Sequence, residues 1–143
     1  MQSIKIAKLD PEATLPTRKH PADAGLDLYA NRTFIIESHS FAIVSTGITI
    51  EIEDGFVGLL KPKGRSNHLL GAGVVDAGYQ GEILVKVANI NDTPLLINPG
   101  DAIGQLLILP IFTPEVIETN AEEIHLADSS RGVSGGIVDQ HKK

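Results

Sequence analysis

The chain has 143 residues, a length typical of one domain rather than two. Hydrophobic residues make up 42% of it, which is enough for a packed core, but aromatic residues make up only 4% and Trp is absent, so the core must be aliphatic. The formal net charge of -6 argues against a nucleic-acid binder, because such proteins usually carry a basic surface. A few Arg residues or a metal ion can still hold a small phosphorylated ligand.

Cysteine is absent, which excludes disulfides and thiolate chemistry. The first eight residues are too short in apolar length for a signal peptide, and no run approaches transmembrane length. We therefore expect a cytoplasmic protein with no membrane partner.

Alternating polar and apolar residues predict strands along most of the chain. The alternation is clearest at Ile48, Ile50 and Ile52, whereas residues 10–23 contain three prolines and predict a loop. The near-continuous apolar run at 102–111 predicts a strand buried on both faces. Residues 115–118 are a weaker candidate, and 121–124 are ambiguous. The expected strands span residues 3–8, 26–29, 33–37, 41–52, 56–60, 82–89, 93–97 and 102–111.

One short helical turn is expected at residues 66–70, with Ser66 as its N-cap. Many short strands joined by Pro and Gly turns predict an all-β fold, a jelly-roll-like β-sandwich or barrel of short strands with one short helix. We expect the β domain to span residues 1–127. Residues 128–143 are rich in Ser, Gly and charge, and we expect them to form a mobile tail.

Five polar, glycine-containing clusters interrupt the strands. Each alone is an ordinary turn signal. In chain order they are Asp-Ala-Gly-Leu-Asp-Leu-Tyr at 23–29, Gly-Arg-Ser-Asn at 64–67, Gly-Val-Val-Asp-Ala-Gly-Tyr-Gln-Gly at 73–81, Gly-Asp-Ala-Ile-Gly-Gln at 100–105, and Arg-Gly-Val-Ser-Gly-Gly at 131–136.

In order and content these clusters resemble the five motifs of the homotrimeric dUTP diphosphatase (dUTPase) family. The resemblance runs from Ala24 to about Gly136, and the third cluster is its most specific part. It implies a jelly-roll subunit, a homotrimer whose active sites each borrow residues from several subunits, and hydrolysis of dUTP to dUMP and pyrophosphate with Mg²⁺.

The third motif carries the roles closest to the chemistry. The resemblance implies that Asp76 activates the attacking water as a general base, and that Tyr79 packs under the deoxyribose and rejects a ribose 2'-hydroxyl. Main-chain groups of Gly73, Val74 and Val75 would read the uracil edge.

The other motifs imply contacts to the triphosphate and to the metal. Asp27 would help to hold Mg²⁺ through its water shell, and Arg131 would reach the γ-phosphate from another subunit. Arginine suits phosphate because its planar fork matches phosphate oxygens. The remaining residues implied to bind the substrate are Arg65, Ser66, Asn67 and Gln105.

Each residue also has an ordinary structural interpretation. Asp76 and Asp27 can be turn residues, and Tyr79 a strand-end aromatic. Arg131 can be a solvated charge. Capping of the expected helix is enough to explain Ser66 without a ligand. Gln105 lies inside an apolar run and needs either a core hydrogen bond or a ligand. The five histidines show no ligand spacing and are expected on the surface.

Three departures from the family pattern leave alternatives open. Arg65 and Asp76 are only eleven positions apart, and Gly64 stands where the family usually has Pro. After Arg131 the fifth motif lacks the usual aromatic residue and the small loop of hydroxyl and glycine residues, and Asp139 would bring a negative charge near the phosphates. A nucleotide-binding or regulatory relative with weak or no catalysis is therefore the main alternative. A dCTP deaminase-type enzyme is disfavoured because residues 65–76 offer no Glu as its base.

Overall fold

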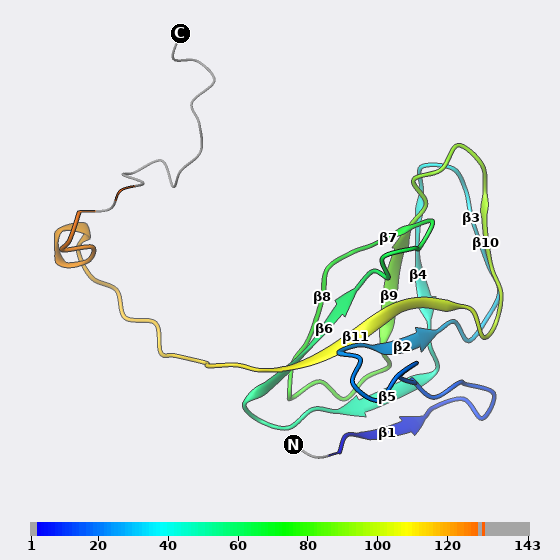
Figure 1. The fold of residues 1–143 in the computed structure, drawn as a ribbon, viewed down its shortest axis with the longest axis horizontal. Helices are drawn as coiled ribbons and strands as arrows, with labels where there is room; N and C mark the ends of the chain where they lie inside the picture. Colours follow the sequence, from blue (N-terminus) through cyan, green and yellow to red (C-terminus); the bar gives the residue numbers. More distant parts are fainter. Residues whose placement is uncertain (1–2, 129, 131–143) are drawn as a thin grey trace, which may run out of the picture. The chain divides into compact units, whose positions relative to one another are not determined.

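The computed structural model describes residues 3–128 and 130, and it divides into two units, Met1–Phe112 and Thr113–Lys143. The first unit is built from short antiparallel strands (Figure 1), which confirms the predicted all-β, jelly-roll-like class. Its strands are β1 (Lys5–Lys8), β2 (Leu26–Tyr29), β3 (Phe34–Ile36), β4 (Phe41–Ser45), β5 (Ile48–Glu51), β6 (Phe56–Lys61), β7 (Leu69–Leu70), β8 (Gly73–Val75), β9 (Leu84–Ala88), β10 (Leu95–Ile97) and β11 (Ala102–Pro110).

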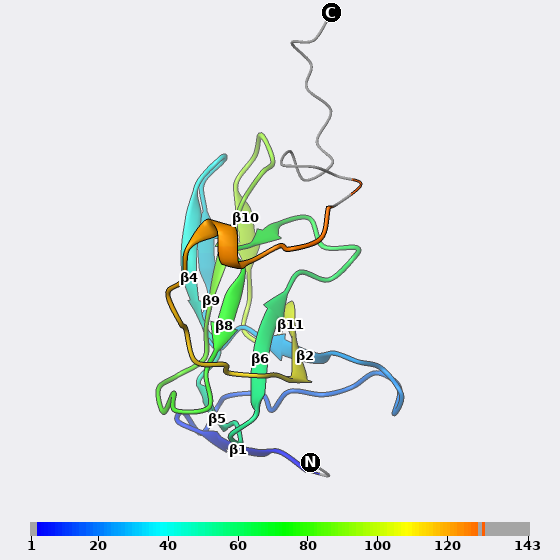
Figure 2. The same ribbon diagram turned by 90° about the vertical axis from the view of Figure 1, so that its left-hand side faces the viewer.

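The described strands form four sheets, with the orders β1-β5, β10-β3, β2-β11-β6-β8 and β4-β9-β7. The long strand β11 pairs with β2 along its first half and with β6 along its second half. Figure 2, turned by 90°, shows β6, β11 and β2 side by side. β8 completes this sheet beside β6, so the third motif begins at a sheet edge.

The expected strand at 41–52 is divided in two by Gly47. This glycine has a φ of +69°, and a Cβ there would lie 2.7 Å from Nδ2 of Asn31, so both backbone and space require glycine. The chain changes sheets at this point, because β4 pairs with β9 whereas β5 pairs with β1. The alternating pattern predicted extended chain on both sides, but not the sheet to which each half belongs.

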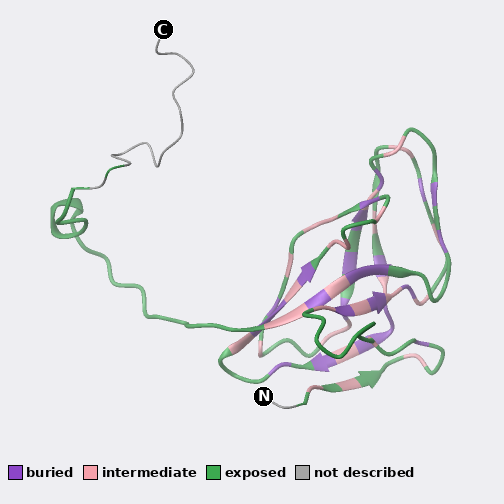
Figure 3. Ribbon diagram, viewed as in Figure 1, coloured by how far each residue is buried: buried purple, intermediate pink, exposed green. Residues whose placement is uncertain are grey.

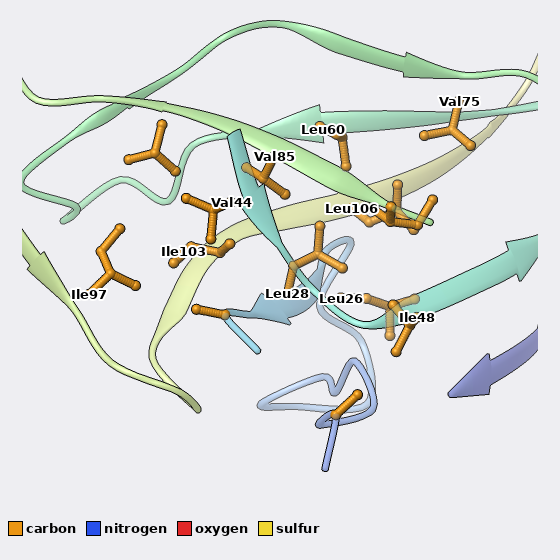
Figure 4. Packing of buried hydrophobic residues seen from close by; sticks show 14 of the residues in the cluster. Leu26, Leu28, Val44, Ile48, Leu60, Val75, Val85, Ile97, Ile103 and Leu106 are labelled. Carbon is orange, nitrogen blue, oxygen red and sulfur yellow. The ribbon is translucent and has the colours of Figure 1, made fainter. Parts of the chain in front are cut away.

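The core is aliphatic, as the composition predicts. Leu28, Val44, Val85, Val87 and Leu106 are 0% exposed, and they come from four different strands. Figure 3 shows the buried positions alternating with exposed ones along the strands, and Figure 4 shows the core side chains converging between the sheets. Burying each side chain of this size contributes about 1.5–3 kcal/mol.

The prediction that 102–111 is buried on both faces is wrong for its second half. Ile103 and Leu106 are buried, but Leu109 is 39% and Ile111 37% exposed. β2 pairs only as far as Leu106, so beyond that residue β11 has a described neighbour on one side only.

The predicted helix at 66–70 is also wrong. Leu69 and Leu70 form β7 and pair with Ala88 and Val87 of β9. His68 is buried, and its Nε2 lies 2.8 Å from the carbonyl oxygen of Ile103. These long-range contacts override the local capping preference of Ser66.

The second unit, described as far as residue 128 and at 130, has one 3-10 turn, η1 (Ala121–Glu123), and no strand at 115–118 among the described residues. The hydroxyl of Thr119 donates to the Glu123 carboxylate beside this turn. In the part of the chain that is described, no helix is long and apolar enough to span a membrane.

Candidate functional site

The segment after β8 forms a tight, exposed turn. Asp76 directly follows Val75, and its main-chain carbonyl accepts a hydrogen bond of 3.0 Å from the Tyr79 amide. The side chain of Asp76 is left exposed, because the turn uses only the main chain of this residue. No described strand other than β6 pairs with β8, so the outer main-chain edge of residues 73–75 is available to a ligand.

Tyr79 is fixed in place by its two neighbours. Its hydroxyl donates to the main-chain carbonyl of Glu82 at 2.6 Å. A Cβ at Gly81 would lie 2.6 Å from the Tyr79 hydroxyl oxygen and 2.8 Å from its Cζ, closer than real Cβ contacts. Glycine at 81 is therefore what allows the tyrosine ring to lie back over the turn.

The turn is attached to the junction between β4 and β5 by side chains that the sequence did not point out. The Glu82 carboxylate accepts a hydrogen bond from the Ser45 hydroxyl and one of 2.8 Å from the Gly47 amide. Thr46 donates to the carbonyl of Ile83 at 2.5 Å, and Thr49 donates to the carbonyl of Gly81 at 2.8 Å. The alternation at 82–89 predicted a strand position for Glu82, but no local signal predicts its partners.

A hollow of about 230 Å³, the hairpin hollow, opens between this turn and the neighbouring strands. Main-chain donors and acceptors at a sheet edge, beside apolar walls, suit a flat heterocycle with polar edges. Its lining residues are Leu60, Gly73, Val74, Val75, Tyr79, Glu82, Ile83 and Leu84.

A second hollow of about 390 Å³, the cationic hollow, lies at the loop between β6 and β7. It brings Lys63, Arg65, Ser66 and Asn67 together with His68 and Ala102. The burial of His68 contradicts the expectation that all histidines lie on the surface, because its ring fastens this loop to β11. Two positive side chains beside hydroxyl and amide groups suit an anion.

Asp27 and Gln105 lie beside the cationic hollow on adjacent strands. They are directly opposed in the β2–β11 pairing, and a Cβ at Gly25 would lie 2.1 Å from Oε1 of Gln105. Nε2 of Gln105 donates to the carbonyl of Pro62 at 3.1 Å, which supplies the partner that a polar residue in this run needs. Oδ1 of Asp27 lies 2.6 Å from Nζ of Lys63, a residue that the sequence analysis left out of the site.

The predicted site residues therefore fall into two groups. No described residue lines both hollows, and Asp76 lies on the exposed turn without lining either. Arg131 lies outside the described residues. Among residues 3–128 and 130, no three His, Asp or Glu side chains are grouped so that they could hold a metal ion.

Known proteins resemble this chain over most of its length. A family model described as dUTPase matches residues 11–136. Deoxyuridine 5'-triphosphate nucleotidohydrolases of Mycolicibacterium gilvum and Mycobacterium marinum are 40% and 37% identical over 141 residues, covering 93% of this chain and 92% of each relative.

Solved structures agree with the sequence relatives. The dUTPase from phage phi11 of S. aureus superposes with a TM-score of 0.78 at 26% identity, covering 82% of this chain and 96% of the phage chain. A mutant dUTPase of Staphylococcus bacteriophage 80alpha with dUpNHpp superposes with a TM-score of 0.82 at 25% identity, covering 96% and 100% of the two chains.

Proposed function

The chain belongs to the dUTPase family, and we propose that it hydrolyses dUTP to dUMP and pyrophosphate. The observation that carries this proposal is the family match over residues 11–136, which includes the turn bearing Asp76 and Tyr79. The hydrogen bonds that hold this turn to β4 and β5 support a site that is formed before the substrate binds.

The hairpin hollow is proposed to take the deoxyuridine. The free main-chain edge of Gly73, Val74 and Val75 would pair with the uracil edge, and the Tyr79 ring would pack against the sugar. A site that hydrogen-bonds one base edge rejects other bases strongly, because a wrong base leaves buried polar groups unpaired. The restricted position of Tyr79 over Gly81 supports exclusion of a 2'-hydroxyl.

Asp76 is proposed to act as the general base at the α-phosphorus. Its carboxylate would take a proton from the attacking water as the new P–O bond forms, and pyrophosphate would leave with the electron pair of the broken P–O bond. The exposure of Asp76 supports this role, because its carboxylate has no partner among the described residues.

The cationic hollow is proposed to bind the triphosphate. Arg65, Ser66 and Asn67 would donate to phosphate oxygens, with Gln105 holding the loop through Pro62 and Arg131 reaching the γ-phosphate from another subunit. Since the deoxyuridine and triphosphate residues line separate hollows, we propose that neighbouring subunits complete each site.

A homotrimer is the assembly that we propose. The outer face of the β4-β9-β7 sheet supports it, because Phe41, Ile43, Leu69 and Leu84 are exposed there by 62%, 45%, 51% and 44%. Exposed apolar residues gathered on one face often mark a protein contact, and Lys86, whose Nζ lies 5.0 Å from the centre of the Phe41 ring, is the charged residue among them. Light scattering should give a trimer for the wild type and a smaller species for Ile43→Glu.

Mg²⁺ is proposed as the metal of the reaction, bound chiefly by the triphosphate, as Mg²⁺ usually is in nucleotide sites. The described residues do not fit a metal held by the protein, because Oδ1 of Asp27 is already paired with Lys63. When bound to the phosphates, Mg²⁺ would neutralise part of their charge. A cytoplasmic location stays a prediction from the sequence.

A pyrophosphate-release assay over dUTP, dCTP, dTTP and UTP with Mg²⁺ tests this proposal. We expect release from dUTP alone. Tight binding of dUTP without release would instead support the regulatory alternative, and ammonia release from dCTP would support the deaminase alternative.

A further inference from the structure

The ion pair between Asp27 and Lys63 is the most enclosed one among the described residues. The two atoms are 2.6 Å apart, and the side chains are 18% and 35% exposed. By contrast, the pair of Lys5 and Glu51 is 84% and 63% exposed. Exposed pairs contribute little because water screens them, whereas a partly enclosed pair holds its geometry better.

The backbone around Lys63 is fixed on both sides. The carbonyl of Pro62 accepts from Gln105, and the carbonyl of Lys63 accepts from the Ser66 amide at 3.1 Å. Gln105 is itself opposite Asp27 in the β2–β11 register. The same hydrogen bonds that shape the cationic hollow therefore aim the Lys63 side chain at the Asp27 carboxylate.

We propose that Lys63 is the resident counter-cation of Asp27, and that it allows this chain to bind the triphosphate with little dependence on a divalent cation. This inference rests on the proposed function. A divalent cation at Asp27 would lie beside an ammonium and be repelled by it. Lys63 also lines the cationic hollow together with Arg65, so its ammonium is near enough to neutralise the charge of a phosphate bound there.

The proposal predicts two separate properties of the protein. In the wild type, the Kd for the dUTP analogue dUpNHpp should change less than about fivefold between EDTA and Mg²⁺, since the ammonium is already in place. In Lys63→Met, binding in EDTA should weaken by about ten- to a hundredfold, the loss expected for one charge-assisted hydrogen bond. Mg²⁺ should restore much of this binding, because Asp27 is then free.

Calorimetry with dUpNHpp in EDTA and in Mg²⁺ tests both properties. Mn²⁺ binding to the nucleotide-free protein, followed by electron paramagnetic resonance, tests whether Lys63 keeps a divalent cation away from Asp27. Lys63→Met should bind Mn²⁺ more tightly than the wild type does. Lys63→Arg keeps the charge and should resemble the wild type in EDTA. Lys61→Met is the matched control, since Lys61 is two residues away, exposed and outside the lining of the hollow.

The outcomes separate this inference from the proposed function. If the wild type binds dUpNHpp only with Mg²⁺, and Lys63→Met does the same, the role of Lys63 is refuted while the dUTPase proposal stands. If dUpNHpp binds under neither condition and dUTP releases no pyrophosphate, both proposals are refuted. Equal losses of dUpNHpp affinity in Lys61→Met and Lys63→Met would mean that only the overall charge of the protein matters, and would also refute the role of Lys63.

Discussion

Gly81 is the position where one added methyl group should displace the Tyr79 ring and lower activity on dUTP while the β fold stays intact. In Gly81→Ala, the new Cβ would lie 2.6 Å from the Tyr79 hydroxyl oxygen, so the ring must move away. It would then lose its hydrogen bond to the carbonyl of Glu82, worth about 1 kcal/mol, and leave its preferred rotamer at a cost of about another 1 kcal/mol. These costs lower the stability of the turn, whereas affinity falls because the displaced ring no longer packs against the sugar; a loss of about 2 kcal/mol in that contact corresponds to roughly a 30-fold loss of affinity.

Steady-state pyrophosphate release from dUTP measures this loss as a fall in kcat/KM. Gly78→Ala is the matched control in the same turn, since a Cβ at 78 meets nothing within 4 Å, and it should stay within about twofold of the wild type. Wild-type kcat/KM in Gly81→Ala, or an equal loss in Gly78→Ala, would refute the role given to the Tyr79 ring.

Two further changes test the fold. The pKa of the Asp10 carboxyl is lowered because the Glu12 amide and the Asn31 side chain donate hydrogen bonds to its carboxylate. The ionised carboxylate therefore stabilises the fold above the ordinary pKa of 3.8, and this stabilisation is lost as the pH falls through the lowered pKa. Asp10→Asn should therefore lower Tm at pH 7. Calorimetry should find that the difference in Tm between the wild type and this variant disappears in acid, and an equal difference at about pH 2 would contradict the prediction. Leu28→Ala should cost about 2–5 kcal/mol in urea unfolding, whereas Leu9→Ala, at a 57% exposed site, should cost less than about 0.5 kcal/mol; similar losses would contradict the assigned core.

Local pattern was enough to predict most strands but not their partners. The alternation around Ile48 and Ile50 reports which face is buried, and this depends only on neighbouring residues. The division at Gly47 and the pairing of Leu69 with Ala88 depend on residues distant in the sequence. A cap signal at Ser66 therefore predicted a helix where tertiary pairing forms a strand.

The candidate site shows the same limit. The segment at 73–81 could be recognised because its motif residues lie close together in the sequence. The structure forms it into a turn closed by the hydrogen bond from the Tyr79 amide to the Asp76 carbonyl. The pair of Asp27 and Lys63 joins residues 36 positions apart, and no local pattern indicates it. His68 is expected on the surface because the five histidines show no ligand spacing, whereas the structure buries it and its Nε2 lies within hydrogen-bonding distance of the Ile103 carbonyl of β11.

Asp76→Asn tests the central claim most directly. Asparagine keeps the shape of the side chain, and the turn uses the main-chain carbonyl of this residue, so the thermal unfolding curve should match that of the wild type. Without a general base, pyrophosphate release from dUTP should fall by about 10²- to 10⁴-fold. If the folded variant releases pyrophosphate as fast as the wild type, Asp76 is not the catalytic base.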